Sequence, residues 1–213
     1  MNLPNALTLS RIFLAPVFFL SLFIPIWTGV GFMVCYAIAW LLFLYIEISD
    51  IVDGHLARTM GLVSDLGKLL DPFSDVISRL TYFVAFVAIP GVLLPGTYSG
   101  LAGGIMPIWM FLIILYRELG VTFLRTILFN RGIAMAARKG GKAKAILYAI
   151  SGGAGLLVIG AIHFHFDQSI QQFTQTVALI SFSLSVLVSA VSFVDYVFVF
   201  LKLYRESEAQ SKS

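Results

Sequence analysis

Residues 30–48 read VGFMVCYAIAWLLFLYIEI, and this stretch decides the fold class. It is an apolar run with a single charged residue, Glu47. The hydrocarbon core of a bilayer is about 30 Å thick, so a helix needs roughly 20 apolar residues to cross it. The stretch is therefore long enough and apolar enough to form a membrane-spanning helix.

The composition of the whole chain also indicates a membrane protein. Of its 213 residues, 59% are hydrophobic and 12% are charged, and the mean hydropathy is +0.95. A soluble domain is roughly 45–50% apolar and about 25% charged. The difference excludes an ordinary soluble globule and an intrinsically disordered chain. The single cysteine, Cys35, excludes a disulfide-stabilised scaffold.

Six apolar stretches follow one another along the chain. We expect an all-α integral membrane bundle of six transmembrane helices, forming a single domain over residues 1–205, with a polar, disordered tail at 206–213. The first helix contains Pro16 and is expected to begin before its apolar core, near Thr8. The expected spans cover residues 12–26, 30–48, 76–94, 105–128, 145–166 and 177–201.

Positive charges predict the orientation of this bundle, because short loops rich in Lys and Arg stay on the cytoplasmic side. With six spans, the Lys and Arg residues all fall on the side of the N-terminus, and the loops 25–31, 95–107 and 163–175 contain none. We therefore expect a multi-pass protein of the cell (inner) membrane, with both termini and the active site facing the cytoplasm. Its basic face attracts anionic lipid headgroups and phosphorylated solutes, and no nucleic acid partner is expected.

Acidic residues concentrate between the second and third expected spans, where residues 49–75 read SDIVDGHLARTMGLVSDLGKLLDPFSD. On a helix with 100° per residue, Asp50 and Asp53 lie about 60° apart. Asp71 and Asp75 are four residues apart and lie on one stripe of the next helix. Two neighbouring helices thus present two carboxylates each, and solvation of a loop gives no reason for that spacing.

Pro72 leaves the start of the second of these helices open. Either Asp71 caps the helix with Pro72 at its first position, or the helix begins near Ser64 and contains the proline. In both alternatives Asp71 and Asp75 remain within one turn of each other.

Four facing carboxylates near a membrane need a counter-charge, because they cannot all stay ionised without one. Ligation by oxygen alone, without His or Cys, suits Mg²⁺, Mn²⁺ or Ca²⁺, and metals shared with a phosphate are most often Mg²⁺. The small residues Gly54, Ala57 and Gly67 would let a bulky anionic ligand approach the helix backbone. Arg58 beside them can contact phosphate through its planar guanidinium.

The pattern D50-x-x-D53-G54-x-x-A57-R58 followed by G67-x-x-x-D71-x-x-x-D75 resembles the complete signature of the CDP-alcohol phosphotransferase family. The resemblance implies a six-helix membrane enzyme, often a homodimer, in which an alcohol attacks a CDP-linked donor and displaces CMP. It implies that the four aspartates bind two Mg²⁺ or Mn²⁺ ions and that Asp75 is the general base. The residues that it implies for the donor and its nucleotide are Asp50, Asp53, Gly54, Ala57, Arg58 and Gly67.

Two further segments are similar to the phosphatidylglycerophosphate synthases of that family. Residues 2–16 read NLPNALTLSRIFLAP, and residues 117–125 read RELGVTFLR and are followed by GIAMAARKGGKAK at 132–144. This similarity implies a transferase of phospholipid biosynthesis that moves a phosphatidyl group from CDP-diacylglycerol to glycerol 3-phosphate. Other small or lipid alcohols remain alternative acceptors.

The cations between residues 117 and 144 are more numerous than membrane topology requires. Arg117 lies at membrane depth, where an unpaired cation is costly, so we expect it to pair with Glu118 or with a carboxylate of the metal site. A pocket for a second phosphate, such as that of glycerol 3-phosphate, would account for the others. The candidates for that phosphate are Arg117, Arg125, Arg138, Lys139, Lys142 and Lys144.

Three positions depart from the glycerophosphate enzymes. Ala145 and Tyr148 stand where Thr and Gln are common, and Val76 stands where Lys is common. These departures leave open transfer from CDP-choline or CDP-ethanolamine to diacylglycerol, and the use of inositol phosphate, serine or phosphatidylglycerol as acceptor. A cation transporter is the alternative of another class, although no chain of acidic residues continues toward the opposite face of the membrane.

Overall fold

The computed structural model of the chain describes the backbone of residues 3–59, 65–89, 104–133 and 139–211. Within these ranges it describes all side chains except those of residues 3–4, 53–58, 65–66, 68–69, 139–140, 142 and 208–211.

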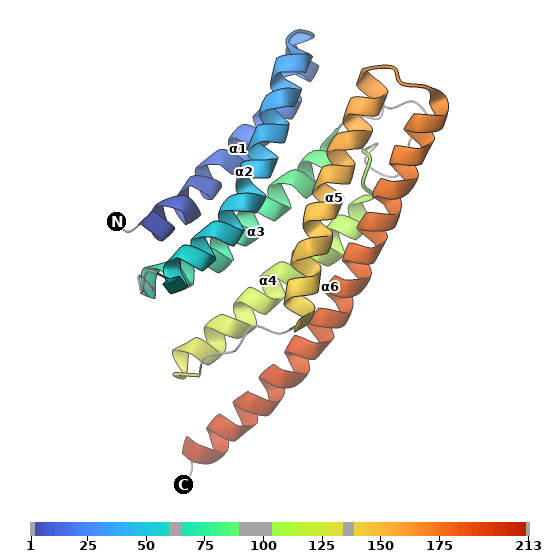
Figure 1. The fold of residues 1–213 in the computed structure, drawn as a ribbon. Coiled ribbons are helices and arrows are strands. Elements are labelled where there is room, and N and C mark those ends of the chain that lie inside the picture. The colour runs from blue at the N-terminus through green and yellow to red at the C-terminus, as the bar shows by residue number, and fades with distance from the viewer. Residues whose placement is uncertain (1–2, 60–64, 90–103, 134–138, 212–213) are drawn as a thin grey trace.

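The described residues form six helices and no strand, which confirms the all-α prediction (Figure 1). The helices are α1 (Leu3–Thr28), α2 (Phe32–Thr59), α3 (Asp65–Ala88), α4 (Ile108–Asn130), α5 (Lys139–His163) and α6 (Gln168–Ser211).

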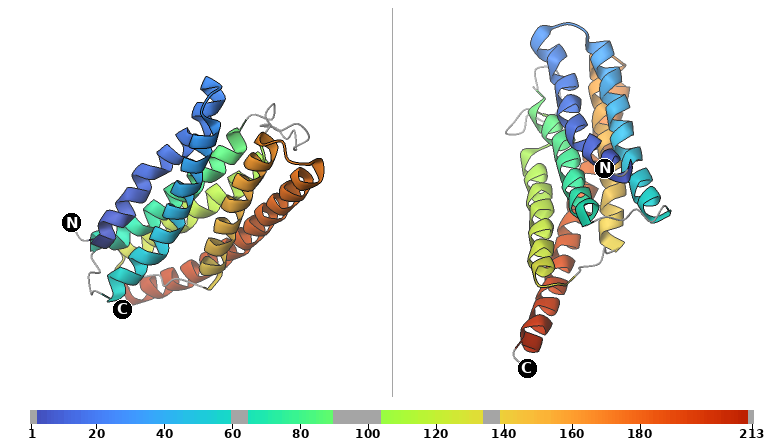
Figure 2. Two further views of the ribbon diagram at one scale, coloured as in Figure 1. Left: turned by 45° about the horizontal axis from the view of Figure 1, so that its top comes forward. Right: turned by 90° about the vertical axis from the view of Figure 1, so that its left-hand side faces the viewer.

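The helices pack as two groups that meet along the middle of the bundle. In one group α1 packs against α2 and α3, and in the other α6 packs against α4 and α5. Contacts of α3 with α4 and α5, and of α2 with α5, join the groups. Both chain ends lie toward the same end of the bundle, away from the α1–α2 and α5–α6 turns (Figures 1 and 2).

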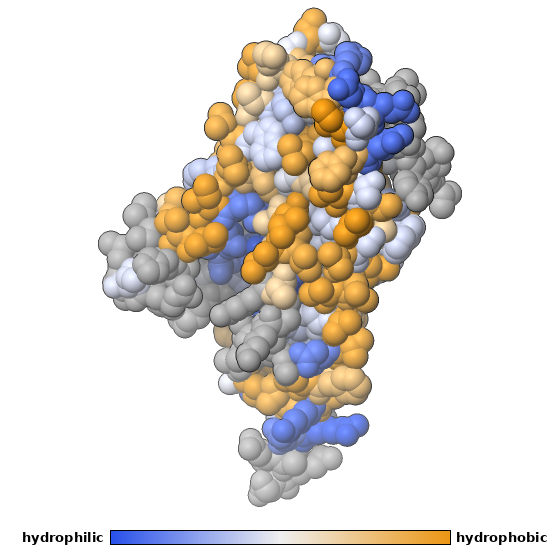
Figure 3. All heavy atoms as spheres, turned by 45° about the vertical axis from the view of Figure 1, so that its right-hand side comes forward, coloured by the Kyte–Doolittle hydropathy of each residue, from blue (hydrophilic) through white to orange (hydrophobic). Residues whose placement is uncertain are grey.

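Apolar side chains cover much of the outer surface, as the face in Figure 3 shows. Helices α1, α2, α5 and α6 are long and apolar enough to cross a membrane. Helix α4 carries Arg117, Glu118 and Arg125, and the described part of α3 carries Asp71, Asp75 and Arg79. The structure therefore confirms six helices, and it identifies four of them as candidate spans by length and composition.

The helix boundaries differ from the sequence predictions at three points. Helix α1 is already helical at Leu3 and continues through Pro16, so it begins before Thr8. Helix α3 includes Pro72, which selects the alternative in which the proline lies inside the helix. Helix α6 continues to Ser211, into the segment 206–213 for which a polar tail is predicted. Glu, Ala and Gln in that segment are good helix formers, which accounts for the longer helix.

An aromatic core joins the two groups of helices. Phe83 of α3 lies edge-on against Tyr148 of α5, with ring centroids 5.2 Å apart. Phe86 of α3 contacts Phe182 of α6, with centroids 6.1 Å apart. A Cβ added to Gly155 of α5 would lie 2.6 Å from the Phe86 ring, so this glycine permits the close approach of α3 and α5.

We expect Gly155→Ala to destabilise the purified protein in detergent. The fully buried Phe86 ring has no room to move away, and overpacking of this kind costs about 1–3 kcal/mol. Gly153→Ala is the matched control, because its new Cβ would be 3.8 Å from Phe43, an ordinary contact. Thermal unfolding should show a lower melting temperature for Gly155→Ala than for Gly153→Ala; equal values would contradict this packing.

Candidate functional site

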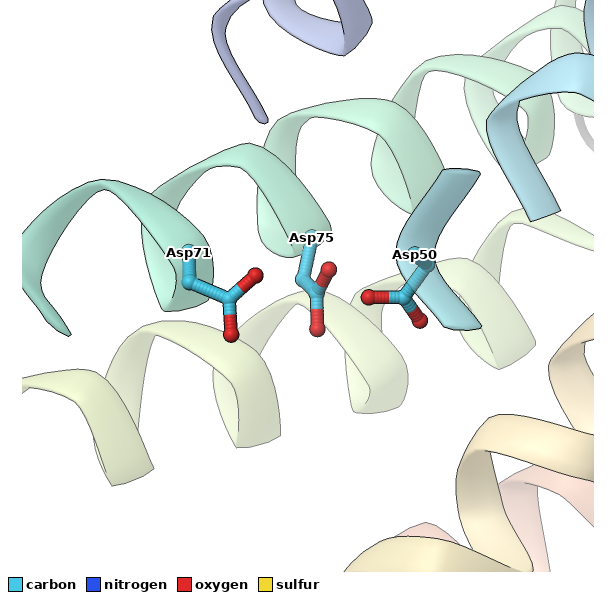
Figure 4. A group of neighbouring side chains, drawn as sticks. All are labelled: Asp50, Asp71 and Asp75. Atoms are coloured by element: carbon cyan, nitrogen blue, oxygen red, sulfur yellow. The ribbon is translucent and has the colours of Figure 1, made fainter. Parts of the chain in front are cut away.

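Three of the predicted aspartates converge where α2 lies beside α3 (Figure 4). Asp50 lies on α2, and Asp71 and Asp75 lie on successive turns of α3, so that one face of α3 presents both. One carboxylate oxygen from each residue lies within 4.8 Å of the others. The Asp50 and Asp75 side chains are about a quarter exposed, and that of Asp71 is half exposed.

Arg11 of α1 binds all three carboxylates. Its Nη1 atom donates to Asp50 Oδ1 at 2.8 Å and to Asp75 Oδ1 at 2.7 Å, and its Nη2 atom donates to Asp71 Oδ1 at 3.0 Å. Only 1% of the Arg11 side chain is exposed. A buried guanidinium needs anionic partners, and here it has three, which fixes α1 against α2 and α3.

A second arginine faces the other oxygens of the same acids. Arg79 of α3 donates through Nη2 to Asp50 Oδ2 at 2.9 Å, and its Nη1 atom is 3.6 Å from Asp75 Oδ2. Asp50 and Asp75 therefore lie between two guanidinium groups, one from α1 and one from α3.

Burial changes the proton affinity of the aspartates on α3, which precede the expected span 76–94. It raises the pKa of Asp75 to about 7, and the neighbouring Asp50 and Asp71 carboxylates act in the same direction, against the lowering effects of Arg79 and Arg11. Burial also raises the pKa of Asp71, although Arg11 opposes the shift. Both carboxyls thus hold a proton more tightly than an exposed aspartate.

For most of the other residues of the predicted signature the structure describes the backbone but not the side chain. Asp53, Gly54, Ala57 and Arg58 belong to the helical backbone of α2, but their side chains lie outside the described residues. Gly67 lies in α3, one turn before Asp71.

A second polar cluster surrounds the buried Glu118 of α4. Its Oε1 atom accepts hydrogen bonds from Lys144 Nζ at 2.7 Å and from Tyr148 Oη at 3.0 Å, both on α5. Arg117 Nη1 lies 3.1 Å from both carboxylate oxygens of Glu118, and Arg117 Nη2 donates to Ser192 of α6. Of the two partners expected for Arg117, the structure selects Glu118.

Arg125 lies on the same face of α4 as Arg117, as their spacing of eight residues predicts. It donates to Tyr196 Oη at 2.8 Å, and both guanidinium groups lie over the Tyr196 ring, 5.3 Å from its centroid for Arg125 and 5.5 Å for Arg117. The buried Nε atoms of these two arginines have no hydrogen-bond partner among the described residues. Buried donors of this kind require an acceptor, which a water molecule or a bound anion can supply.

Three more cations were predicted to bind the acceptor phosphate. Lys139 and Lys142 belong to the first turn of α5, but their side chains lie outside the described residues. Arg138 lies outside the described residues altogether.

One cavity of about 230 Å³ joins the two clusters. On the side of α2 and α3 the charged residues that line it are Asp50, Asp75 and Arg79. On the side of α4 and α5 they are Arg117, Glu118, Arg125 and Lys144. Its wall also contains Val76 and Ala145, two of the positions at which the sequence departs from the glycerophosphate enzymes. The cavity therefore combines an acidic wall, suited to cations, with a basic wall, suited to an anion.

The acidic wall has the chemistry of a divalent metal site. Three carboxylates supply oxygen ligands within 4.8 Å of one another, without His or Cys, and this donor set suits Mg²⁺ or Mn²⁺. Two guanidinium groups already bind the same oxygens, which shows that this cluster attracts positive charge.

Sequence reasoning missed two residues at the centre of the site. The sequence predicts no role for Arg11 and Arg79 beyond the orientation of the bundle, although each interrupts a largely apolar helix, where a buried cation requires an anionic partner. That requirement was a usable signal. The sequence contains no such signal for Tyr196, because tyrosine is common in membrane helices near the headgroups.

Comparison with known proteins agrees with the site. The sequence profile described as CDP-alcohol phosphatidyltransferase matches residues 1–203. The chain is 32% identical to a probable phosphatidylglycerophosphate synthase of Mycobacterium tuberculosis over 198 residues, which cover 92% of this chain and 80% of the relative. It is 34% identical to the CDP-diacylglycerol–glycerol-3-phosphate 3-phosphatidyltransferase of Bacillus subtilis over 165 residues, 73% of this chain and 77% of that one.

A protein of the same name in Treponema pallidum is 39% identical over 108 residues. That match covers 51% of this chain and 44% of the relative, so it concerns about half of each protein.

We expect cation binding by the purified protein to weaken as the pH falls. Below its raised pKa of about 7, Asp75 carries a proton and cannot ligate a cation, so the apparent Mn²⁺ affinity should fall by about tenfold per pH unit. Above pH 7 the affinity should level off. Calorimetric titration with MnCl₂ between pH 5.5 and 8.5 measures this, and an affinity that is constant across the range would contradict the expectation.

Proposed function

The chain belongs to the CDP-alcohol phosphatidyltransferase family, and on that premise we propose that it moves a phosphatidyl group from CDP-diacylglycerol to glycerol 3-phosphate and releases CMP. The names of the M. tuberculosis and B. subtilis relatives support this choice of reaction. One observation of the structure carries it: a single cavity has an excess of carboxylates on one wall and an excess of cations on the other. Glycerol 3-phosphate carries a hydroxyl for the first wall and a phosphate for the second.

In the proposed reaction the acceptor hydroxyl attacks the phosphorus of the phosphatidyl group. A new P–O bond forms, the P–O bond to CMP breaks, and CMP leaves with the electron pair. Asp75 accepts the hydroxyl proton as general base. We assign two Mg²⁺ or Mn²⁺ ions to Asp50, Asp53, Asp71 and Asp75, and such ions supply neutralisation of the charge on the diphosphate.

We assign the donor to the part of α2 and α3 that precedes the cavity. Gly54, Ala57 and Gly67 would let the nucleotide approach the helix backbones, and Arg58 would contact a phosphate of the donor. Asp50 and Asp53, which would hold the metal ions, are assigned to the same donor.

The basic wall has an excess of positive charge for the acceptor phosphate. Glu118 balances one of the charges of Arg117 and Lys144, and Arg125 adds another beside them. The surplus fits a phosphate group, and the orphaned Nε atoms of Arg117 and Arg125 are donors for it. We include Arg138, Lys139 and Lys142 in this wall because of their place in the sequence.

Two residues of the cavity favour a second candidate acceptor. Val76 stands where Lys is common in the glycerophosphate enzymes, and Ala145 stands where Thr is common. Both residues line the cavity and make its wall less polar. A less polar alcohol is therefore the alternative, with the same donor and the same carboxylates. Transfer from CDP-choline or CDP-ethanolamine to diacylglycerol is a further alternative, which the assay described below also tests.

We place the protein in the cell membrane with six spans and with the cavity facing the cytoplasm. The common location of both chain ends supports an even number of spans (Figure 1), and the one-sided distribution of Lys and Arg supports the orientation. We propose that the protein is a single domain and a homodimer, in which apolar side chains exposed on the bundle contact lipid and the second copy.

The test of this function is an assay of the purified protein with CDP-diacylglycerol or CDP-choline against a panel of alcohols. We expect CMP release with CDP-diacylglycerol and glycerol 3-phosphate in the presence of Mg²⁺ or Mn²⁺, and none after chelation. Asp75→Asn should lower the rate by about a hundredfold or more, because the general base is lost. Unchanged turnover of that variant would disprove the role of Asp75, and ion flux in liposomes without nucleotide turnover would favour a transporter.

Arg125→Gln tests the basic wall. Loss of a charge-assisted contact to phosphate should raise the KM for glycerol 3-phosphate by about tenfold or more, with a smaller change in kcat. Arg131→Gln is the control, because Arg131 follows α4 and donates to Tyr204 and Ser207, away from the cavity. An equal KM for glycerol 3-phosphate in the two variants would show that Arg125 does not bind the acceptor.

A further inference from the structure

Arg11 is the least expected part of the acidic wall. It lies in the apolar helix α1, within the candidate span Asn5–Thr28, and its side chain is 1% exposed. Arginine in such a place is rare and is held there by specific anions. The three anions that hold it are the carboxylates proposed to bind metal, Asp50, Asp71 and Asp75.

The guanidinium and a metal ion meet the same electrostatic need. The planar group takes one oxygen from each of the three carboxylates, and those residues form the only such group of potential ligands among the side chains that the structure describes. A divalent cation bound there would lie next to the guanidinium, and the two positive charges would repel each other. Metal binding and the present position of Arg11 therefore oppose each other.

Arg79 also faces two of these acids, but through their other oxygens. It lies one turn from Asp75 on the same helix, and it approaches the Oδ2 atoms of Asp50 and Asp75. The Oδ1 atoms of these two residues belong to Arg11, which reaches them from a different helix. Arg11 can thus leave the acids while Arg79 still holds Asp50 and Asp75 together.

We propose that Arg11 is a positioning residue that competes with the metal ions for Asp50, Asp71 and Asp75, and that it yields them when a diphosphate-bearing donor offers its guanidinium a new anionic partner. The inference rests on the proposed function, because it assumes that these acids bind metal. Its consequence is coupling: the metal and the donor each bind more tightly when the other is present. Without the donor, Arg11 keeps the acids together and weakens metal binding.

The test is calorimetric titration of the full-length protein in detergent with MnCl₂, alone and with saturating CDP-diacylglycerol. Arg11→Gln, which removes the competing charge, should bind Mn²⁺ about tenfold more tightly than the wild type without the donor. The donor should strengthen Mn²⁺ binding by about tenfold in the wild type and by much less in this variant. Arg131→Gln, which removes an exposed arginine away from the cavity, should match the wild type in both titrations.

Equal or weaker Mn²⁺ binding by Arg11→Gln without the donor would overturn the proposal, because Arg11 would then be neutral or supportive toward the metal. If Arg11→Gln does not fold, Arg11→Met replaces it. Methionine also removes the charge, and its flexible apolar side chain adapts to an apolar helix interface. Tighter Mn²⁺ binding by Arg11→Met supports the proposal, and unchanged or weaker binding overturns it. A wild-type protein that binds no Mn²⁺ even with the donor would instead disprove the metal site of the proposed function.

Discussion

Pairing of buried charge, above all that of the Arg11 guanidinium with three carboxylates, is the constraint on which this structure depends. Asp50, Asp71 and Asp75 lie within hydrogen-bond reach of one guanidinium, in a bundle with a largely apolar surface. Charges in such surroundings persist only when they are paired. Arg11 can pair with all three acids only if α1 packs against both α2 and α3, which is the packing observed. The site therefore helps to determine the arrangement of the first three helices.

The same constraint organises the other half of the bundle, but there a buried acid is held by cations. There the buried acid is Glu118, and its partners Arg117, Lys144 and Tyr148 tie α4 to α5, while Arg117 also reaches Ser192 of α6. The cavity lies where the two halves meet. The proposed reaction between a diphosphate-bearing donor and a phosphorylated alcohol would use an acidic and a basic wall facing one space, and the junction of the two halves provides both.

The sequence predictions succeeded where the sequence has a strong periodic pattern. The spacing of Asp71 and Asp75 placed both on one face of α3, and apolar runs placed all six helices, because helix period and lipid thickness are fixed quantities. The partners of these acids were not predictable by spacing. Arg11 is 39 residues from Asp50 and 64 from Asp75, so their contact depends on how helices pack. The longer α6 was missed because a polar sequence alone does not distinguish a helix from a tail.

The most direct test of the account is electron paramagnetic resonance of the purified protein with Mn²⁺ and the CDP-linked donor. If α2 and α3 hold a pair of ions through aspartate oxygens, the spectrum will be that of two exchange-coupled Mn²⁺ ions, and Asp71→Asn will abolish the coupling. A spectrum of isolated Mn²⁺ ions only, or one that Asp71→Asn leaves unchanged, would contradict the account.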